Sequence, residues 1–301
     1  MLKKIIFSII GLICFSLLFI DIGNLISERI IDALWPIGHV TVFAFWSFLL
    51  LRYQPTIKTA SLNKQFILLT LFCFSLGITI ELIQPFFGRS REVGDVFMNY
   101  VGVLLSIFIV NRHRIHWGFK FAYISLFGYL LLPSALTLFD EAKLRYEFPV
   151  LASFQQDIAL TRWKSDQPLS LASPLSEGHD MMKITFVPRQ YSGVALRYFQ
   201  GDWVSYKQLT IRFYNPNSAA LPVTLIMTDK HYNKGKPNSQ DRFDKDLQVK
   251  PGLSQIKIPL TTIKNGVALR DMDLSQMAGV DFYMYDLTGP VYLYLESVYL
   301  E

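Results

Sequence analysis

Six strong polar side chains lie between two apolar runs of this chain, and their types are those of acid–base and anion-binding sites. They fall in the stretch ITIELIQPFFGRSREVGDVFMNYVG and are Glu81, Gln84, Arg89, Arg91, Asp95 and Asn99. Carboxylates can transfer protons, whereas amides and guanidinium groups orient phosphate or hydroxyl groups. Ionisable groups at membrane depth are costly unless they are paired, so this stretch is the first candidate for a functional site.

The spacing of these residues predicts where they meet. Glu81 and Gln84 are three residues apart on one face of a predicted helix, and Asp95 and Asn99 are four apart on a face of the next. Pro85 breaks the first helix and allows a turn. Because a short connection makes the two helices neighbours, we expect the polar pairs to converge.

A third helix should bring a histidine to the same depth. His39 lies in the stretch WPIGHVTVFAFW and enters from the outer end of that helix. His39, Glu81 and Asp95 are therefore acid–base candidates. The alternative is structural, with the two arginines of the stretch as headgroup anchors or as salt-bridge partners of the carboxylates.

Small residues extend the face that Asp95 and Asn99 share. Gly102 and Ser106 follow them at helical spacing. Small side chains let a neighbouring helix approach closely, so we expect a tight helix contact at this face.

Five apolar runs reach the length that a membrane span needs. They cover about residues 4–21, 37–53, 65–85, 93–110 and 117–139. We read the first as an uncleaved helix, because no small-residue cleavage site follows it. Cys14 and Cys73, the only cysteines, both fall in these runs, so no disulfide framework is expected. Residues 1–139 thus predict a multi-pass α-helical membrane domain.

Basic residues are shared unequally between the two sides of these predicted helices. Eight lie on one side, namely Lys3, Lys4, Arg52, Lys58, Lys64, Arg112, Arg114 and Lys120. Three lie on the other, namely Arg29, Arg89 and Arg91. The bias predicts an inner-membrane protein with a cytoplasmic amino terminus and a periplasmic or extracellular carboxy-terminal half. The net charge of +5 then reflects topology, and no basic patch interleaved with aromatic residues suggests nucleic acid.

The polar pattern of the helical half resembles the VanZ-like membrane protein family. That family shows a His at a helix start, then E-x-x-Q near an Arg, then D-x-x-x-N-x-x-G. The matching residues here are His39, Glu81, Gln84, Arg89 or Arg91, Asp95, Asn99 and Gly102. The resemblance covers about residues 30–110 and departs from the family at LWPIG, where a basic residue usually precedes the His. It implies an envelope protein linked to glycopeptide antibiotic resistance, with no established reaction.

Residues 145–301 alternate apolar and polar side chains in short runs that Gly, Pro, Asn and Asp punctuate. Seven runs indicate strands: MKITFVP, GVALRYF, QLTIRFYN, LPVTLIMTD, SQIKIPL, GVDFYMYD and VYLYLESVYL. The polar stretch DKHYNKGKPNSQDRFDKD is expected to be a loop. This spacing predicts an all-β antiparallel sandwich, which joins the helical half near LFDEAKLRYEFP.

Sandwiches of this kind often bind sugars, which need aromatic faces for stacking and planar polar groups for the hydroxyls. The candidate faces are Trp203, Tyr206, Tyr232 and Phe243. The candidate polar groups are Asp229, His231, Asp241, Arg242 and Arg270. The alternation in FYMYD and VYLYLESVYL favours core positions for the aromatic residues of those two strands.

The same half resembles jelly-roll carbohydrate-binding modules. The shared elements are N-P, D-R-F, P-G and I-P-L, closed by an aromatic-rich strand, and they cover about residues 195–300. The last strand departs from the pattern, with Glu296 or Ser297 where an Asp is usual. Such modules can hold a structural calcium ion, but no liganding spacing here fixes a site, and no other cofactor is expected.

Together these features predict a VanZ-like protein of the bacterial envelope that binds or acts on carbohydrate-bearing material. An outward-facing polar pocket and a tethered sandwich would share an envelope glycan or glycolipid, with membrane lipids as further partners. Whether the chain is an enzyme stays open. The alternative is a non-enzymatic anchor that carries a carbohydrate- or protein-binding module. A transporter is least favoured, because no second polar set lies in the inner half.

Overall fold

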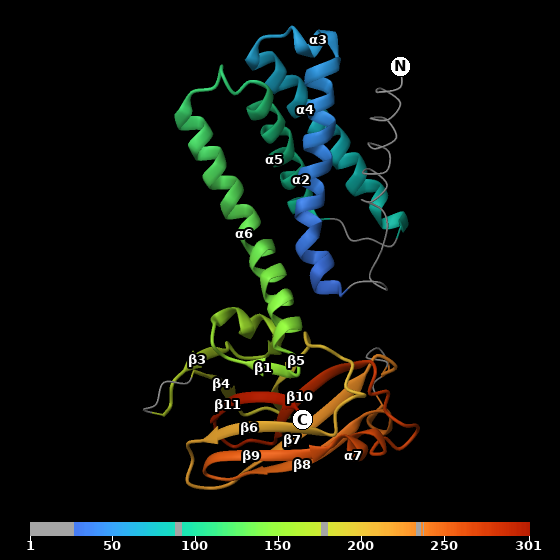
Figure 1. The fold of residues 1–301 in the computed structure, drawn as a ribbon, viewed down its shortest axis with the longest axis vertical. Helices are drawn as coiled ribbons and strands as arrows, with labels where there is room; N and C mark the ends of the chain where they lie inside the picture. Colours follow the sequence, from blue (N-terminus) through green and yellow to red (C-terminus); the bar gives the residue numbers. More distant parts are fainter. Residues whose placement is uncertain (1–26, 88–91, 176–179, 233–235, 237) are drawn as a thin grey trace. The chain divides into compact units, whose positions relative to one another are not determined.

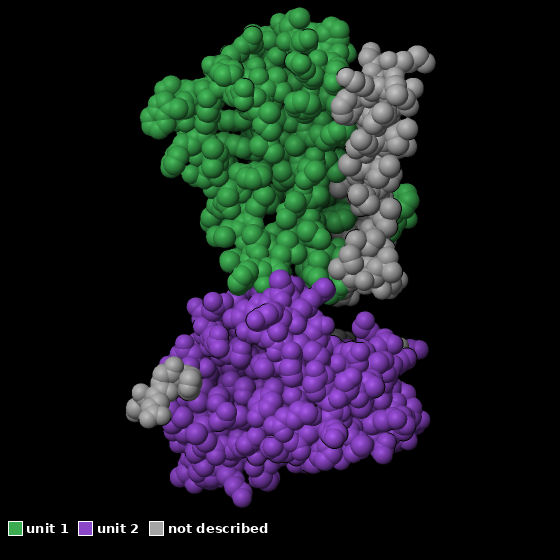
Figure 2. Space-filling view, viewed as in Figure 1, with its two compact units in different colours: residues 1–139 green, residues 140–301 purple. Residues whose placement is uncertain are grey.

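The computed structural model describes residues 27–87, 92–175, 180–232, 236 and 238–301. The chain divides into two compact units, residues 1–139 and 140–301, which Figure 2 colours separately. The predicted helix over 4–21 and the candidate residues Arg89 and Arg91 lie outside the described residues.

The first unit is built from helices (Figure 1). They are α2 (Glu28–Tyr53), α3 (Pro55–Lys58), α4 (Leu62–Ile83), the 3-10 helix η1 (Gln84–Phe87), α5 (Val93–Val110) and α6 (Trp117–Glu147). Within the described residues, α2, α4 with η1, α5 and α6 are the four helices long and apolar enough to cross a membrane. They correspond to the last four predicted runs.

The amino-terminal end of α2 differs from the prediction. The helix begins at Glu28 rather than near residue 37, because the Ser27 side chain accepts a hydrogen bond from the Ile30 backbone N–H at 3.3 Å. Pro36 removes one backbone hydrogen bond without ending the helix. His39 therefore lies inside a helix and not at its start.

The carboxy-terminal end of α6 also lies beyond the predicted boundary at 139. Its polar last turns stay helical to Glu147, with Leu144 buried and an ion pair between Lys143 and Glu147 four residues apart. From Asp140 on, these turns belong to the second unit. There the buried Asp140 carboxylate accepts hydrogen bonds from the Arg162 guanidinium at 2.7 and 3.0 Å.

The contact between α2 and α5 confirms the prediction from small residues. A Cβ added at Gly102 would overlap the Val40 carbonyl oxygen and lie 3.0 Å from the Ala44 backbone nitrogen. The Ser106 hydroxyl donates a hydrogen bond to the Ala44 carbonyl. Only glycine at 102 permits this approach of the two backbones.

The second unit is an antiparallel sandwich of two β-sheets. One sheet has the order β3-β4-β11-β6-β9, with β1 paired to β11, and the other has the order β2-β5-β10-β7-β8. Their bounds are β1 (Val150–Ser153), β2 (Trp163–Ser165), β3 (Ser170–Ala172), β4 (Met181–Phe186), β5 (Tyr191–Leu196), β6 (Gln208–Asn215), β7 (Leu221–Asp229), β8 (Phe243–Val249), β9 (Gly252–Pro259), β10 (Met277–Tyr285) and β11 (Val291–Leu300). The short helices are η2 (Asp157–Arg162), η3 (Ser239–Asp241) and α7 (Leu260–Lys264).

The seven predicted strands are all present, as β4 to β7 and β9 to β11. The predicted polar loop after β7 is wrong at its end, because β8 begins at Phe243. Leu247 and Val249 join Phe243 in the core, while the charged residues between them face away. The end of the predicted loop is therefore a strand with one apolar face, although the stretch as a whole is polar on average.

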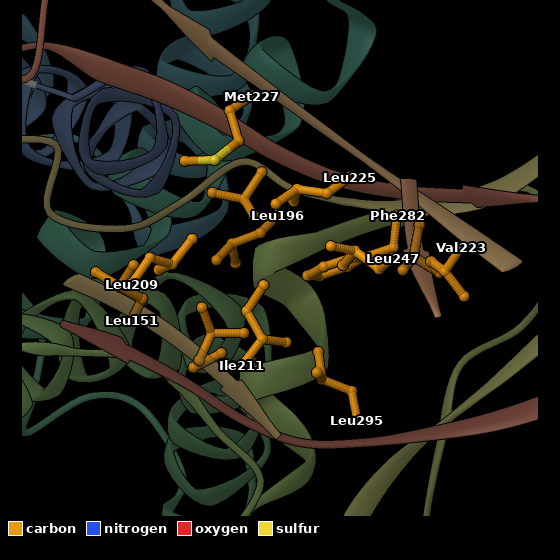
Figure 3. Close-up of a cluster of buried hydrophobic side chains, with 14 of the residues drawn as sticks. Leu151, Leu196, Leu209, Ile211, Val223, Leu225, Met227, Leu247, Phe282 and Leu295 are labelled. Atoms are coloured by element: carbon orange, nitrogen blue, oxygen red, sulfur yellow. The ribbon is translucent and has the colours of Figure 1, made fainter. Parts of the chain in front are cut away.

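Side chains from both sheets meet in one core (Figure 3). Leu209, Ile211 and Leu295 point inward from one sheet toward Leu225 and Phe282 of the other. The interior of the sandwich is apolar, so polar binding groups must lie on its outer faces or in its loops.

Gly102→Ala should destabilise the helical unit by roughly 1–3 kcal/mol, because a methyl group there overpacks the α2–α5 contact. The measurement is denaturant unfolding of the purified chain in detergent. The control is Gly128→Ala in α6, where an added Cβ meets nothing within 4 Å and should leave the helix equally or more stable. Equal stability of both variants would contradict the close approach.

Candidate functional site

Strand β10 sends alternate side chains to opposite faces of its sheet. Phe282 and Met284 are buried in the core. Asp281, Tyr283 and Tyr285 therefore face away from it. These three outward residues form the floor of a cleft.

The cleft lies on the outer face of the sheet that contains β5, β10, β7 and β8, and its volume is about 350 Å³. We call it the tyrosine cleft. Its lining residues are Tyr191, Arg197, Ile226, Thr228, Tyr232, Arg242, Asp281, Tyr283 and Tyr285.

A glycine on β5 sets the position of the central tyrosine. Tyr283 is paired with Gly193 in the antiparallel register. A Cβ added at Gly193 would lie 2.6 Å from Tyr283 Cδ1 and would overlap the Phe282 carbonyl oxygen. The missing side chain lets the Tyr283 ring occupy the space above the β5 backbone, where it lines the cleft.

A second glycine makes room for an arginine at the next part of the floor. Arg197 binds both carboxylate oxygens of Asp281, with Nη2 at 2.8 Å from Oδ2. A Cβ at Gly279 would lie 2.6 Å from Arg197 Nη1. The pair fixes the guanidinium plane, and a guanidinium has five N–H donors, so donors remain for ligand hydroxyls.

Tyrosines and a second arginine form the rest of the wall. Tyr191 and Tyr285 meet edge to face with ring centroids 5.2 Å apart. Arg242 Nε donates to Asp244 Oδ1 at 2.9 Å, and Tyr232 lines the same wall. Both arginines of the cleft thus carry a carboxylate partner.

The tyrosine hydroxyls of the floor stay protonated at neutral pH. Burial raises the pKa of Tyr283, and the neighbouring Asp281 carboxylate raises it further. Burial also raises the pKa of Tyr285. Each hydroxyl can therefore donate a hydrogen bond as well as accept one.

The predicted sugar-binding aromatics divide between the core and the surface. Trp203 is 0% exposed and donates its indole N–H to the Gln200 carbonyl at 2.8 Å, and Phe243 is also buried. Their prediction as stacking faces is wrong, because no ring face reaches solvent. Tyr232 lines the tyrosine cleft, whereas Tyr206 lines a separate cleft beside α7.

Sequence reasoning missed most of the tyrosine cleft. It placed the aromatics of FYMYD in the core, whereas only Phe282 is there and the two tyrosines face outward. The signal was the alternation itself, which must expose one set when it buries the other. Tyr191 begins β5 and Arg197 directly follows its last residue, and no local pattern marks them.

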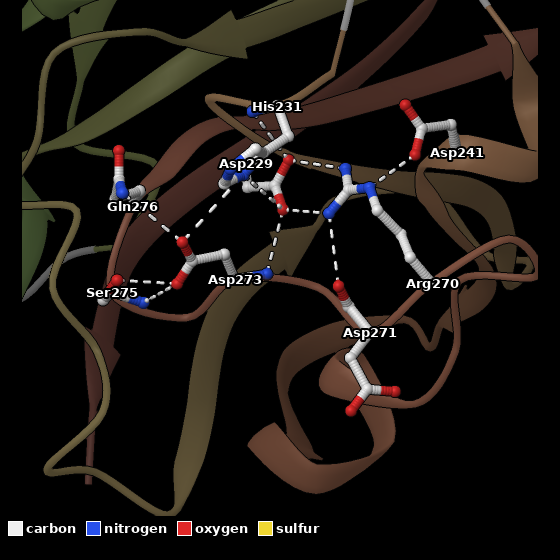
Figure 4. Close-up of polar contacts among 8 residues, drawn as sticks. All are labelled: Asp229, His231, Asp241, Arg270, Asp271, Asp273, Ser275 and Gln276. Atoms are coloured by element: carbon white, nitrogen blue, oxygen red, sulfur yellow. Dashed lines mark hydrogen bonds and ion pairs between the residues drawn. The ribbon is translucent and has the colours of Figure 1, made fainter.

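The predicted polar contacts form a latch between loops (Figure 4). Buried Asp229 accepts two hydrogen bonds from Arg270, at 2.5 and 2.7 Å, and Arg270 Nε donates to Asp241 at 2.7 Å. Backbone N–H groups of His231 and Asp273 complete the shell of Asp229 at 3.1 and 2.9 Å. Asp229 is committed to this latch, which corrects its prediction as a ligand contact.

The charge of Asp229 is stabilised by this latch. Burial opposes its ionisation, but the hydrogen bonds from Arg270 and from the Asp273 backbone outweigh burial and lower the pKa of Asp229 below its usual value. The same contacts raise the pKa of Arg270. The pair is therefore ionised at neutral pH and holds the β7 end to the loop before β10.

In the helical unit, the predicted polar residues of α2 and α5 do meet. His39 is 0% exposed, with Nδ1 at 2.8 Å from Asn99 Oδ1 and Nε2 at 3.2 Å from Asp95 Oδ2. Trp35, which sequence reasoning did not single out, donates its indole N–H to the same Asp95 oxygen at 2.8 Å. Trp35 lies one turn before His39, and that spacing was the available signal.

Glu81 completes this group, which we call the polar helix cluster (Trp35, His39, Glu81, Asp95 and Asn99). Its Oε2 accepts a hydrogen bond from the Glu92 backbone N–H at 2.7 Å. Its charge interacts electrostatically with Asp95 and His39. Gln84 is also buried, at 1% exposure.

Three atoms of the cluster are buried without a hydrogen-bond partner, namely His39 Nε2, Glu81 Oε1 and Asn99 Nδ2. An unsatisfied buried polar group costs about 1–3 kcal/mol. Within the described residues, no group of three or more His, Cys, Asp or Glu side chains is placed to hold a metal ion. Calcium in the sandwich stays a prediction.

Among known proteins, the chain is similar only to solved structures. No protein-family model and no curated protein matches the chain. The family 11 carbohydrate-binding module of Clostridium thermocellum, solved with a β-1,3-1,4-mixed-linked tetrasaccharide, matches at 14% identity and a TM-score of 0.38, over 50% of this chain and 93% of that one. A non-crystalline-cellulose-specific carbohydrate-binding module of family 28 matches at 12% identity and a TM-score of 0.37. The match covers 51% of this chain and 93% of that one. An exo-β-agarase matches at 13% identity and a TM-score of 0.42. The match covers 50% of this chain and 24% of the agarase chain.

Asp229→Asn should lower the unfolding free energy of the sandwich by about 3 kcal/mol at neutral pH, because it removes the buried carboxylate that accepts two hydrogen bonds from Arg270 and leaves that guanidinium only Asp241. The folded pKa of Asp229 lies below its unfolded value of about 3.9, so the contribution is complete above about pH 4 and is lost as the pH falls through the folded pKa. Denaturant unfolding across this range should show the two proteins converging in acid.

The matched control for that prediction is Asp271→Asn. Its carboxylate is 69% exposed and lies 3.9 Å from Lys264, so its removal should change stability by less than about 0.5 kcal/mol at any pH. If the difference in unfolding free energy between wild type and Asp229→Asn persists in acid, the assigned ionisation of Asp229 is contradicted.

Proposed function

We propose that this chain is a membrane-anchored carbohydrate-binding protein of the bacterial envelope, and that its sandwich binds glycan in the tyrosine cleft. The observation that carries the proposal is the floor of that cleft. There the Tyr283 ring lies over Gly193 beside the bidentate Arg197–Asp281 pair. Flat aromatic surface and a fixed fork of donors thus lie side by side.

This combination suits a sugar better than an apolar ligand. The C–H face of a pyranose packs on an aromatic ring, while its hydroxyls need donors and acceptors in fixed positions. Tyr191 and Tyr285 add ring surface at one end, and both are well exposed, at 55% and 38%. A tyrosine side chain has few rotatable bonds, so the entropic cost of fixing these two side chains against a ligand is low.

The helical unit supports the anchoring part of the proposal. Four of its described helices have the length and apolarity of membrane spans. The excess of basic residues on one side favours a cytoplasmic amino terminus and a sandwich outside the inner membrane. The VanZ-like pattern of His39, Glu81, Asp95 and Asn99 favours a second contact with lipid-linked envelope glycan. A link to glycopeptide resistance rests on that resemblance alone.

A second candidate function leaves the helices as an anchor and the sandwich as the sole binding module. One observation favours it, which is that His39 is fully buried, with Nδ1 bonded to Asn99 and Nε2 facing Asp95 at 3.2 Å. A histidine held in this way serves helix packing. The two candidates differ in whether the polar helix cluster meets a ligand.

Tyr283→Ala should weaken glycan binding by tenfold or more, because loss of a central aromatic anchor costs about 2 kcal/mol. Gly193→Ala should weaken binding in the same direction, since the added methyl displaces the Tyr283 ring. The measurement is isothermal titration of the detergent-solubilised full chain with soluble neutral and acidic polysaccharides.

Tyr292→Ala serves as the control for these variants. Tyr292 is 42% exposed and lies on β11, in the sheet opposite the cleft. Its removal should leave affinity unchanged. Equal losses for Tyr283→Ala and Tyr292→Ala, or the lack of any polysaccharide that binds the folded chain, would refute the proposed cleft.

Orientation can be tested with a membrane-impermeant maleimide on intact cells whose outer membrane has been opened. Lys245→Cys, at an exposed position of β8, should react without opening the inner membrane. Lys58→Cys, exposed in α3, should react only after the inner membrane is permeabilised. The reverse pattern would overturn the proposed topology.

A further inference from the structure

Both ring nitrogens of His39 face polar atoms of α5, but only Nδ1 has a hydrogen-bond partner. An amide oxygen only accepts hydrogen bonds, so the 2.8 Å contact with Asn99 Oδ1 places the proton on His39 Nδ1. Nε2 faces Asp95 at 3.2 Å. His39 therefore lies between Asp95 and Asn99, two residues one turn apart on α5, and Nε2 donates to Asp95 only when the ring is protonated at both nitrogens.

Glu81 and Asn99 have the other two atoms of the cluster that lack a hydrogen-bond partner. Glu81 Oε1 is an acceptor and Asn99 Nδ2 is a donor, and both are buried without a hydrogen-bond partner. Their residues are 8% and 0% exposed. Asn99 Nδ2 lies 3.2 Å from the position of a Cβ on Gly77, and Gly77 and Glu81 are one turn apart on α4. The unpaired donor and acceptor thus belong to one helix interface.

We propose that Glu81 and Asn99 form a ligand site for a hydroxyl group of a membrane-embedded, glycan-bearing lipid, with His39 as a positioning residue. This deepens the proposed function and rests on it. A hydroxyl is the smallest group that donates to Glu81 Oε1 and accepts from Asn99 Nδ2 at once. It also brings no second negative charge beside Glu81 and Asp95, whose carboxylates interact electrostatically.

The division of roles gives each carboxylate a different reactivity. Asp95 accepts from Trp35 and pairs with His39. Glu81 has one oxygen bonded to the Glu92 backbone and one without a partner. A reagent that enters through the lipid should therefore find Glu81 and not Asp95.

The test uses dicyclohexylcarbodiimide, a membrane-soluble reagent for carboxyl groups in apolar surroundings, on the full chain in phosphatidylcholine vesicles. Mass spectrometry should place the adduct on Glu81, and Glu81→Gln should abolish it. In His39→Gln, Asp95 loses its contact with the imidazole and keeps the hydrogen bond from Trp35, so its labelling should rise but stay below that of Glu81. Adduct on Asp95 in the wild type, or none on Glu81 in a folded chain, would refute the assignment.

The ligand class is tested by adding a trace of one of two amphiphiles with the same alkyl chain. Dodecyl maltoside, whose headgroup is rich in hydroxyls, should slow labelling of Glu81 several-fold. Dodecylphosphocholine, whose headgroup has no hydroxyl, should not. Equal effects of both would overturn the hydroxyl site. If dodecyl maltoside does not protect Glu81 in a chain whose tyrosine cleft still binds soluble polysaccharide, this inference alone is overturned. If dodecyl maltoside protects Glu81 but no polysaccharide binds the chain, the tyrosine cleft is refuted instead.

Discussion

A β-strand places successive side chains on opposite faces of its sheet, and in β10 this alternation builds the core and the cleft from the same nine residues. Burial of Val280, Phe282 and Met284 fixes the register of the strand. The register in turn fixes Tyr283 over Gly193 and Asp281 beside Arg197. A slip of one residue would send the tyrosines into the core, so the energy that stabilises the sandwich also positions the candidate site.

Both units bury charged groups, and they satisfy them to different degrees. In the sandwich, Asp229 is fully paired with Arg270 and with backbone N–H groups, which makes the latch a structural feature. In the helical unit, His39 Nε2 lies 3.2 Å from Asp95, and atoms of His39, Glu81 and Asn99 have no hydrogen-bond partner. Unsatisfied buried groups are rare in folded proteins, and this contrast is the physical basis of the proposed ligand site at the helices and of the structural role assigned to the latch.

The sequence predicts the elements better than the faces on which their side chains lie. Long apolar runs and period-two alternation are local signals, so four helices and seven strands follow from them. The helical spacing of Asp95 and Asn99 and the close approach at Gly102 are also local. The floor of the cleft is not, because Tyr283 meets Gly193 some ninety residues away through strand pairing. Trp203 was misjudged for the same reason, since nothing near it in the sequence tells a buried indole from an exposed one.

The central claim is that glycan lies on the outer face of the sheet that contains β10. Hydroxyl-radical footprinting of the full chain, with and without a saturating mixture of soluble polysaccharides, tests it most directly. The account predicts that oxidation of Tyr191, Tyr283 and Tyr285 falls when glycan is bound, while oxidation of Tyr206 and Tyr292 does not change. Protection of Tyr206 in the cleft beside α7, with the three tyrosines of β5 and β10 unaffected, would contradict it.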